Sequence, residues 1–385
     1  MERLVNPVRQ YDWGSRTVIA ALLGRPTPSP GPEAELWMGA HPSDPSSLVR
    51  PGGPVSLATA IEADPAGMLG AVVAKRFGAR LPYLFKVLAA ERPLSLQAHP
   101  DAERAAARHA AGDDNYLDPY HKPELLVALT EFDGLCGFRD PAVSAAVLAE
   151  LRVPALDPVI RRLSEGSVGE RLRGAVTALL TWPEGDRKEV VAEVGAAARD
   201  RTGRPEYEVA ARLADQFPAD LGVVVALLLN HVRLAPGEAI WMPAGNLHAY
   251  LGGTGVEIMA ASDNVLRGGL TSKRIDVAEL LRVLRFEVFA DPVVRPVPVR
   301  PGVLTWSVPV EEFALVKATV TQGGPAVDLP GRGPRIVLCV SGSVEVATGG
   351  ERTRLGCGES VFLPGDAPCA SCAGTGEVFQ AAVDV

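Results

Sequence analysis

Two stretches of the chain repeat one pattern: GEAIWMP at residues 237–243 and GESVFLP at residues 358–364. Each stretch begins with a Gly-Glu turn, continues with four mostly apolar residues and ends at a proline. The offset is constant, since 358 − 237 and 364 − 243 both equal 121. A short apolar run between turn signals is typical of a β-strand, so the repeat predicts two related β units.

Cupin-like jelly rolls approach their metal-bearing strand through the same turn, strand and turn. The chain has 39 Gly and 33 Pro in 385 residues, which favours many turns and many short strands. Both observations predict a mainly β fold built from two cupin-like jelly-roll barrels.

Helical signals interrupt this β pattern between Asp101 and about Leu234. Asp101 precedes an alanine-rich run, and Asp140-Pro141 has the capping residue and proline that begin helices. We therefore expect an inserted α-helical domain at 101–234. The catalytic barrel would comprise 1–100 and 235–288, with the strand of Glu124 returning to it, and the second barrel would comprise 289–385.

Composition and charge exclude several classes of protein. The net charge of −8 argues against a general nucleic-acid binder, and no apolar run is long enough for a membrane span. Charged residues such as Glu2 and Arg3 occupy the place of a signal peptide's apolar stretch, so we expect a cytoplasmic protein. The five cysteines are scattered and indicate reduced thiols, and the role of Cys369 and Cys372 stays open.

The two repeats differ where a metal would bind. An offset of 121 places Cys369 at the position of His248, and no histidine follows His248 in the chain. We therefore expect no histidine-based metal site in the second barrel.

Alternating polar residues mark candidate site strands. Ser95, Gln97 and His99 share one face of a predicted strand. The same alternation pairs Lys122 with Glu124 and His248 with Tyr250, and Glu257 follows a Gly-Gly turn. These faces indicate either a polar outer surface or a site in which two imidazoles, one carboxylate and one amide bind an ion such as zinc. The spacing alone leaves both readings open.

Two basic residues stand out from their surroundings. Lys86 lies between apolar neighbours in a predicted strand, which indicates that it faces a polar cavity. Arg267 lies in a turn-rich polar segment with Asp263, which is either a solvated loop or a guide for an anion.

Together these segments resemble the type I mannose-6-phosphate isomerase (phosphomannose isomerase) family of the cupin superfamily. The resemblance is carried by motifs in family order: YDWG (11–14), ELWMGAHP (35–42), LFKVL (84–88), LQAHPD (96–101), HKPE (121–124), PAGNLHAY (243–250) and VEIMAASDNVLRGGLT (256–271). The sequence departs from the family at Ser272, where a proline is expected, and at 245–247, where the family has a more polar run. Both departures lie beside the site, so they bear on the shape of local loops.

The resemblance implies one zinc ion per chain, bound by Gln97, His99, Glu124 and His248. It implies that Arg267 is the catalytic arginine, with Glu257 as first candidate for the base and Lys122 as second. It further implies that the substrate contacts come from Ser95, Lys86, Tyr250, Asp263 and Lys273.

The implied reaction interconverts mannose 6-phosphate and fructose 6-phosphate through a cis-enediolate, so the expected partner is a small sugar phosphate and neither nucleic acid nor membrane. Two other functions stay open at this point. One is a non-catalytic sugar-phosphate-binding cupin protein, and the other is a cupin metal oxygenase.

Overall fold

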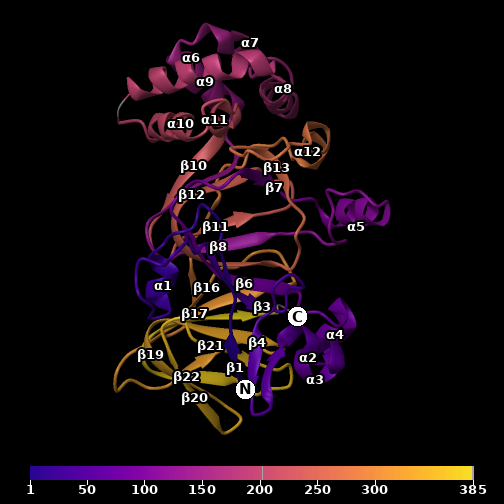
Figure 1. The fold of residues 1–385 in the computed structure, drawn as a ribbon, viewed down its shortest axis with the longest axis vertical. Helices are drawn as coiled ribbons and strands as arrows, with labels where there is room; N and C mark the ends of the chain where they lie inside the picture. The colour runs from indigo at the N-terminus through magenta and orange to yellow at the C-terminus, as the bar shows by residue number, and fades with distance from the viewer. Residues whose placement is uncertain (202, 384–385) are drawn as a thin grey trace.

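Two antiparallel β-sheets and a block of helices make up the computed structural model, which describes residues 1–201 and 203–383. Figure 1 shows helices α6–α11 at one end of an elongated molecule, the sheet with β8, β11 and β12 in the middle, and the sheet with β19 and β22 at the other end. The predicted mainly β architecture with a helical insert is confirmed.

Sheet 1 contains eleven strands and spans the middle of the molecule. Its strands are β2 (Val8–Arg9), β3 (Glu35–Gly39), β6 (Tyr83–Ala90), β7 (Leu96–Ala98), β8 (Glu124–Ala128), β9 (Phe132–Phe138), β10 (Leu229–Leu234), β11 (Ala239–Met242), β12 (His248–Ala260), β13 (Leu266–Gly269) and β14 (Val293–Val294). The long strand β12 pairs with β6, β7, β8 and β9, so it joins the two halves of the sheet.

Sheet 2 also contains eleven strands. They are β1 (Glu2–Val5), β4 (Ser47–Arg50), β5 (Gly53–Ser56), β15 (Val297–Arg300), β16 (Val303–Thr305), β17 (Ala314–Val320), β18 (Val327–Leu329), β19 (Arg335–Thr348), β20 (Glu351–Gly356), β21 (Ser360–Leu363) and β22 (Ala370–Ala382). Strands β1, β4 and β5 come from the part of the chain that we assigned to the catalytic barrel. They join sheet 2 because β1 pairs with the open edge of β21, and Leu4 and Leu48 enter the core between the sheets.

The helices are α1 (Val18–Leu22), α2 (Leu57–Ala63), α3 (Pro65–Leu69), α4 (Ala71–Phe77), α5 (Ala102–Ala110), α6 (Pro141–Leu151), α7 (Asp157–Arg162), α8 (Val168–Leu180), α9 (Glu184–Arg199), α10 (Pro205–Gln216), α11 (Gly222–Ala226) and α12 (Val277–Val283), with a 3₁₀ turn at Pro154–Leu156. The carboxylates of Asp101 and Asp140 accept hydrogen bonds from the first turns of α5 and α6, as their sequence contexts predict. No helix in the described part of the chain has the length and apolar character needed to cross a bilayer.

The segment 101–234, where we expect a mostly helical insertion, also contains three strands. Helices α6–α11 run from Pro141 to Ala226, whereas β8, β9 and β10 lie in sheet 1. Strand β8 is buried along its whole length between β11 and β12, so its apolar side chains require a place inside the sheet. The insertion therefore leaves and re-enters sheet 1 through β9 and β10, which pair with each other.

The sequence repeat corresponds to equivalent strands in the two sheets. Strands β11 and β21 occupy the repeated apolar runs, and each is followed by a strand of 13 residues, β12 or β22. One apolar core lies between the sheets and includes Phe85 and Ile258 from sheet 1 with Phe362 and Phe379 from sheet 2. One face of sheet 1 packs against this apolar core. The opposite face of the sheet is therefore available for polar side chains.

Candidate active site

Three buried side chains converge on one point in sheet 1. His99 follows β7, Glu124 begins β8 and His248 begins β12. One ligand atom from each of these residues lies within 4.8 Å of the other two. The residues are 1–4% exposed, so a cluster of two imidazoles and one carboxylate is withdrawn from water.

Backbone carbonyls orient both imidazoles. His99 Nδ1 lies 2.8 Å from the carbonyl oxygen of Asn264, and His248 Nδ1 lies 3.1 Å from that of Asn246. A proton on each Nδ1 satisfies these contacts and leaves the Nε2 lone pairs directed at Glu124, at 3.4 Å from His99 and 3.2 Å from His248.

The buried Nε2 atom of His99 has no hydrogen-bond partner among the described residues. Leaving a buried polar atom unpaired is costly, and a cation that accepts its lone pair would remove that cost. The donor set of two imidazole nitrogens and a carboxylate is also one that zinc favours. The residues present therefore fit a zinc ion.

The charge states of these groups suit a divalent cation. Burial lowers the pKa of His99 to about 4, against the opposing influence of Glu124, so the imidazole is neutral at pH 7. Burial by itself would raise the pKa of Glu124, but His99, Lys122 and His248 together hold that pKa well below its usual value. Glu124 thus offers an anionic ligand, and His99 offers a neutral one.

Strand register places Gln97 and Arg267 beside this cluster. Gln97 lies directly opposite His248 on one neighbouring strand and opposite Arg267 on the other. Directly opposite residues of antiparallel strands point to the same face, so the three side chains share the polar face of sheet 1. The apolar neighbours Leu96 and Ala98 face the other way into the core of the helical block.

A second buried network is centred on Glu257. It adjoins the group formed by His99, Glu124 and His248, which is called the metal cluster below. Its Oε2 lies 2.6 Å from Lys86 Nζ, and its Oε1 accepts a hydrogen bond of 2.5 Å from the hydroxyl of Tyr250. Lys86 also pairs with Glu35 Oε1 at 3.4 Å, and Glu35 accepts a hydrogen bond from the indole of Trp37. The network explains why a lysine is buried in the middle of β6.

Burial and the surrounding carboxylates shift the acid–base properties of this network. Burial raises the pKa of Glu257, and the Lys86 ammonium opposes that rise. Burial alone would lower the pKa of Lys86, but Glu257 and Glu35 raise it overall, so the lysine stays charged. Glu257 is therefore a carboxylate with enhanced basicity beside a fixed positive charge.

The other predicted site residues lie at different depths. Lys122 is buried, with Nζ 3.3 Å from Glu124 Oε1, and Ser95 is half-buried two residues before Gln97. Arg267 is half-buried, burial lowers its pKa, and it forms no ion pair within the described residues. Asp263 and Lys273 are exposed, and the structure gives the Lys273 side chain no contact with the buried cluster.

Sequence reasoning missed three buried residues on strand β3 and the turn after it. Glu35 and Trp37 line the Lys86 network, and we did not select them from the sequence. His41, which we did not select as a site residue, is 4% exposed, with Nε2 3.5 Å from Asp263 Oδ1. The alternation of Glu35 and Trp37 with Leu36 and Met38 was the available signal.

Sheet 2 has no equivalent cluster among the residues that the structure describes. Cys369, at the position that corresponds to His248, is exposed, while Cys372 is buried in the core of sheet 2. The expected lack of a histidine-based site follows directly from the sequence of this half.

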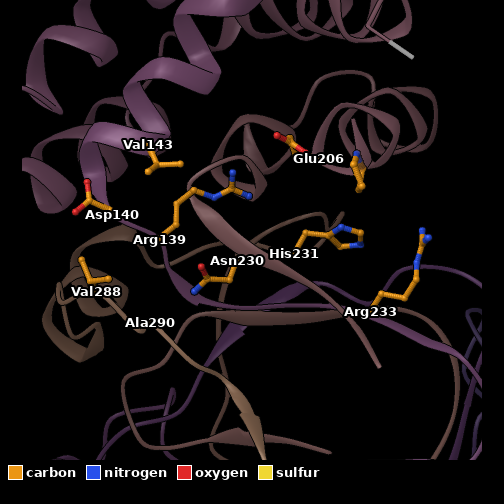
Figure 2. A pocket seen from close by; sticks show the side chains of 10 residues that line it. Arg139, Asp140, Val143, Glu206, Asn230, His231, Arg233, Val288 and Ala290 are labelled. Carbon is orange, nitrogen blue, oxygen red and sulfur yellow. The ribbon is translucent and has the colours of Figure 1, made fainter. Parts of the chain in front are cut away.

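A cavity of ≈ 590 Å³ lies elsewhere, between the helical block and β10 (Figure 2). Its charged groups already have protein partners: Arg139 donates to the carbonyl of Leu229, Arg233 pairs with Asp133, and Glu206 pairs with Arg204. No lining residue belongs to the metal cluster or to the Glu257 network.

Comparisons with known proteins show which family the chain is similar to. A family model described as "Phosphomannose isomerase type I, catalytic domain" matches residues 1–141. Mannose-6-phosphate isomerase of Escherichia coli K12 is 38% identical over 382 residues, covering 94% of each chain, and that of Schizosaccharomyces pombe is 36% identical, covering 89% of each.

Solved structures show the same fold over the whole chain. A variant of phosphomannose isomerase from Salmonella typhimurium matches with a TM-score of 0.93 and 36% identity, covering 100% of both chains. A mannose 6-phosphate isomerase bound with zinc and yttrium matches with a TM-score of 0.91 and the same identity and coverage.

Proposed function

Because the chain belongs to the type I mannose-6-phosphate isomerase family, a zinc-dependent cupin family of aldose–ketose isomerases, we propose that it interconverts mannose 6-phosphate and fructose 6-phosphate through a cis-enediolate. The observation that carries this proposal is the buried cluster of His99, Glu124 and His248, with its unpartnered imidazole nitrogen.

Gln97, His99, Glu124 and His248 are the residues that would hold the zinc ion. When bound, zinc supplies Lewis-acid polarisation of a carbonyl oxygen. The carbonyl partners of the two imidazoles support this assignment, because they direct both Nε2 atoms into the cluster. Gln97 is included because its strand register sets it beside His248.

Glu257 is our first candidate for the base that moves a proton between carbons 2 and 1. Its burial raises its pKa, which brings its basicity closer to what proton abstraction at neutral pH requires. Lys86 and Tyr250 hold its two oxygens and set its orientation. Lys122, the second candidate, has its Nζ 3.3 Å from Glu124 Oε1, so its amine is already engaged by a proposed zinc ligand.

Arg267 would stabilise the negative charge that develops on the enediolate oxygens. Unlike Lys86 and Lys122, it has no carboxylate partner among the described residues, so its charge is available to substrate. Ser95, Lys86 and Lys273 would contact the phosphate or hydroxyl groups of the substrate, with Tyr250 and Asp263 as further contacts to hydroxyls.

A coupled assay that follows fructose 6-phosphate formed from mannose 6-phosphate tests the activity. We expect turnover that a chelator abolishes and zinc restores, with secondary structure retained by circular dichroism. His99→Ala should lose both zinc and activity. Absence of turnover by the metal-loaded protein would favour the non-catalytic sugar-phosphate-binding alternative, and dioxygen consumption would favour the oxygenase.

Running the reaction in D₂O tests the enediolate. Proton abstraction by a side chain that exchanges with solvent places deuterium at carbon 1 of fructose 6-phosphate, or at carbon 2 in the reverse direction. Direct hydride transfer would instead carry the original hydrogen between the carbons without exchange. Complete absence of deuterium over many turnovers would contradict the enediolate route.

A further inference from the structure

Asn264 is a fully buried amide outside the set of residues assigned to zinc or substrate. It lies between β12 and β13, in the segment that also carries Asp263. Its side chain hydrogen-bonds with a different part of the chain, the loop 117–120 between α5 and β8. Its main-chain carbonyl oxygen contacts His99.

The Asn264 side chain holds this loop at several points. Its Oδ1 accepts a hydrogen bond of 2.8 Å from the Leu117 N–H, and its Nδ2 donates to the carbonyls of Asp118 at 2.7 Å and Tyr120 at 2.8 Å. The amide thus uses both its acceptor and its donors on one loop, which fixes the position and the rotation of the side chain.

The Asp118 carboxylate strengthens the same junction from the side of the loop. Its Oδ1 accepts from the Ser262 hydroxyl at 2.8 Å, and its Oδ2 accepts from the Asp263 N–H at 2.8 Å. Loop 117–120 and segment 262–264 are therefore joined in both directions. The loop leads within a few residues to Lys122 and Glu124.

The main-chain carbonyl of Asn264 connects this junction to the metal cluster. It lies 2.8 Å from Nδ1 of His99, so its position sets which nitrogen of that imidazole carries the proton and how the ring is turned. Movement of residue 264 would release His99, and movement of the loop would displace the residues that precede Glu124.

We propose that Asn264 is a positioning residue for the zinc site, which locks loop 117–120 to the carbonyl that orients His99. One side chain thereby couples two ligands, His99 and Glu124, that come from different segments. This inference rests on the proposed zinc site. It predicts that Asn264 controls zinc affinity although its side chain contacts no atom that would bind zinc.

Zinc affinity of the full-length protein, measured by competition with a chromophoric chelator, tests the inference. We expect Asn264→Ala to lower zinc affinity about 10- to 100-fold, the range typical for loss of a residue that orients a metal ligand. The ¹⁵N signals of the His99 ring in the metal-free variant should show loss of the single Nδ1–H tautomer.

Asn230→Ala is the matched control. The Asn230 amide donates to three carbonyls, those of Cys136, Gly137 and Phe289, and it lies in the same sheet without bonding a metal-ligand residue or its carbonyl partner. We expect this variant to lower the melting temperature to a similar extent while zinc affinity stays within about twofold of the wild type.

Asp118→Ala decides the question if Asn264→Ala does not fold. Asp118 is half-buried, and its loss removes the contacts of its carboxylate with Ser262, Asp263 and the Asn264 amide. The main-chain partners of the Asn264 side chain in the same loop remain. We expect a several-fold loss of zinc affinity. Wild-type zinc affinity in Asn264→Ala would overturn the inference. If that variant does not fold, wild-type zinc affinity in Asp118→Ala would do so. An equal loss of zinc affinity in Asn230→Ala would also overturn it. A wild-type protein that binds no zinc would refute the proposed site itself.

Discussion

Arg267 differs from the two buried lysines of the site in how its charge is compensated. Lys86 and Lys122 are buried against carboxylates, whereas the half-buried Arg267 has no ion pair among the described residues. Arginine keeps its proton at ordinary pH, so its contribution is electrostatic. An uncompensated guanidinium opposite Gln97 is placed to meet negative charge that arises only during the reaction.

Arg267→Ala should therefore lower kcat by about 100-fold or more, with a modest change in KM and full zinc content. The reason is that the enediolate charge exists in the transition state, while the phosphate is charged throughout. Steady-state kinetics and metal analysis of the purified variant measure the three quantities, and Arg267→Lys serves as the charge-conserving control. A near-normal kcat with a greatly raised KM would move Arg267 to phosphate binding.

Tyr250→Phe tests Glu257 as the base through pH dependence. The Tyr250 hydroxyl donates to Glu257 and stabilises its ionised form, so removing that hydroxyl should raise the pKa of Glu257 further above its usual value. Because a base must be deprotonated to act, the acidic limb of the kcat/KM profile should move to higher pH. An unmoved limb would show that the activity does not depend on ionisation of Glu257.

Strand β12 explains how much of the site could be predicted from the sequence. The alternation of residues predicted that His248 and Tyr250 share a face, and that Ser95, Gln97 and His99 share another. Which strands are neighbours could not be predicted, because β7 and β12 are separated by the whole helical block. Pairing over such a distance follows from tertiary packing, which local periodicity does not contain.

Two further features, the burial of His41 and the sheet to which β1, β4 and β5 belong, also depend on tertiary packing. Nothing in the sequence around His41 marks it as buried, yet Trp37 packs edge-on against it and Asp263 pairs with it. Strands β1, β4 and β5 belong to sheet 2 because the free edge of β21 can hydrogen-bond with a nearby strand that has a matching apolar face. Neither outcome depends on the composition of the segment itself.

The β9–β10 pair carries a charge network whose effect on stability should depend on pH. Asp133 lies opposite Arg233, accepts a hydrogen bond from it and lies 3.5 Å from His231 Nε2. The nearby His231 imidazole and the hydrogen bond from Arg233 lower the pKa of Asp133 to about 2, despite partial burial. The stabilisation is then present above the ordinary pKa of aspartate, near 4, and is lost as the pH falls towards 2.

Asp133→Asn should accordingly lower the free energy of unfolding at pH 7 by on the order of 1 kcal/mol or less, as for other partly exposed ion pairs. The difference from the wild type should shrink between about pH 5 and pH 3, as measured by urea unfolding at each pH. Asp328→Asn is the control, because Asp328 is exposed and lies as far as 4.0 Å from Arg300, its one partner among the described residues. A difference independent of pH would mean that the carboxylate charge does not stabilise the pair.

At the scale of the whole molecule, the two sheets share one apolar core. Trp306, from the segment between β16 and β17, is 2% exposed and stacks on Phe379 of sheet 2. Its indole N–H donates to the carbonyl of Gly237, the first residue of the repeated stretch in sheet 1. The second barrel thus contributes side chains and a hydrogen bond that support sheet 1.

Trp306→Ala should therefore destabilise both sheets together, by about 3–5 kcal/mol, the usual cost of removing a buried tryptophan side chain. Thermal unfolding followed by calorimetry should show a single transition at lower temperature, because the core between the sheets is continuous. Zinc content and kcat at 25 °C should stay close to the wild type, since Trp306 contacts the Gly-Glu turn and not the polar face. Val299→Ala, at a half-exposed position on edge strand β15, should change the melting temperature little. Two separate transitions in the variant, with that of the zinc-bound sheet unmoved, would show instead that the barrels are stable independently and that the shared core is only an interface between them.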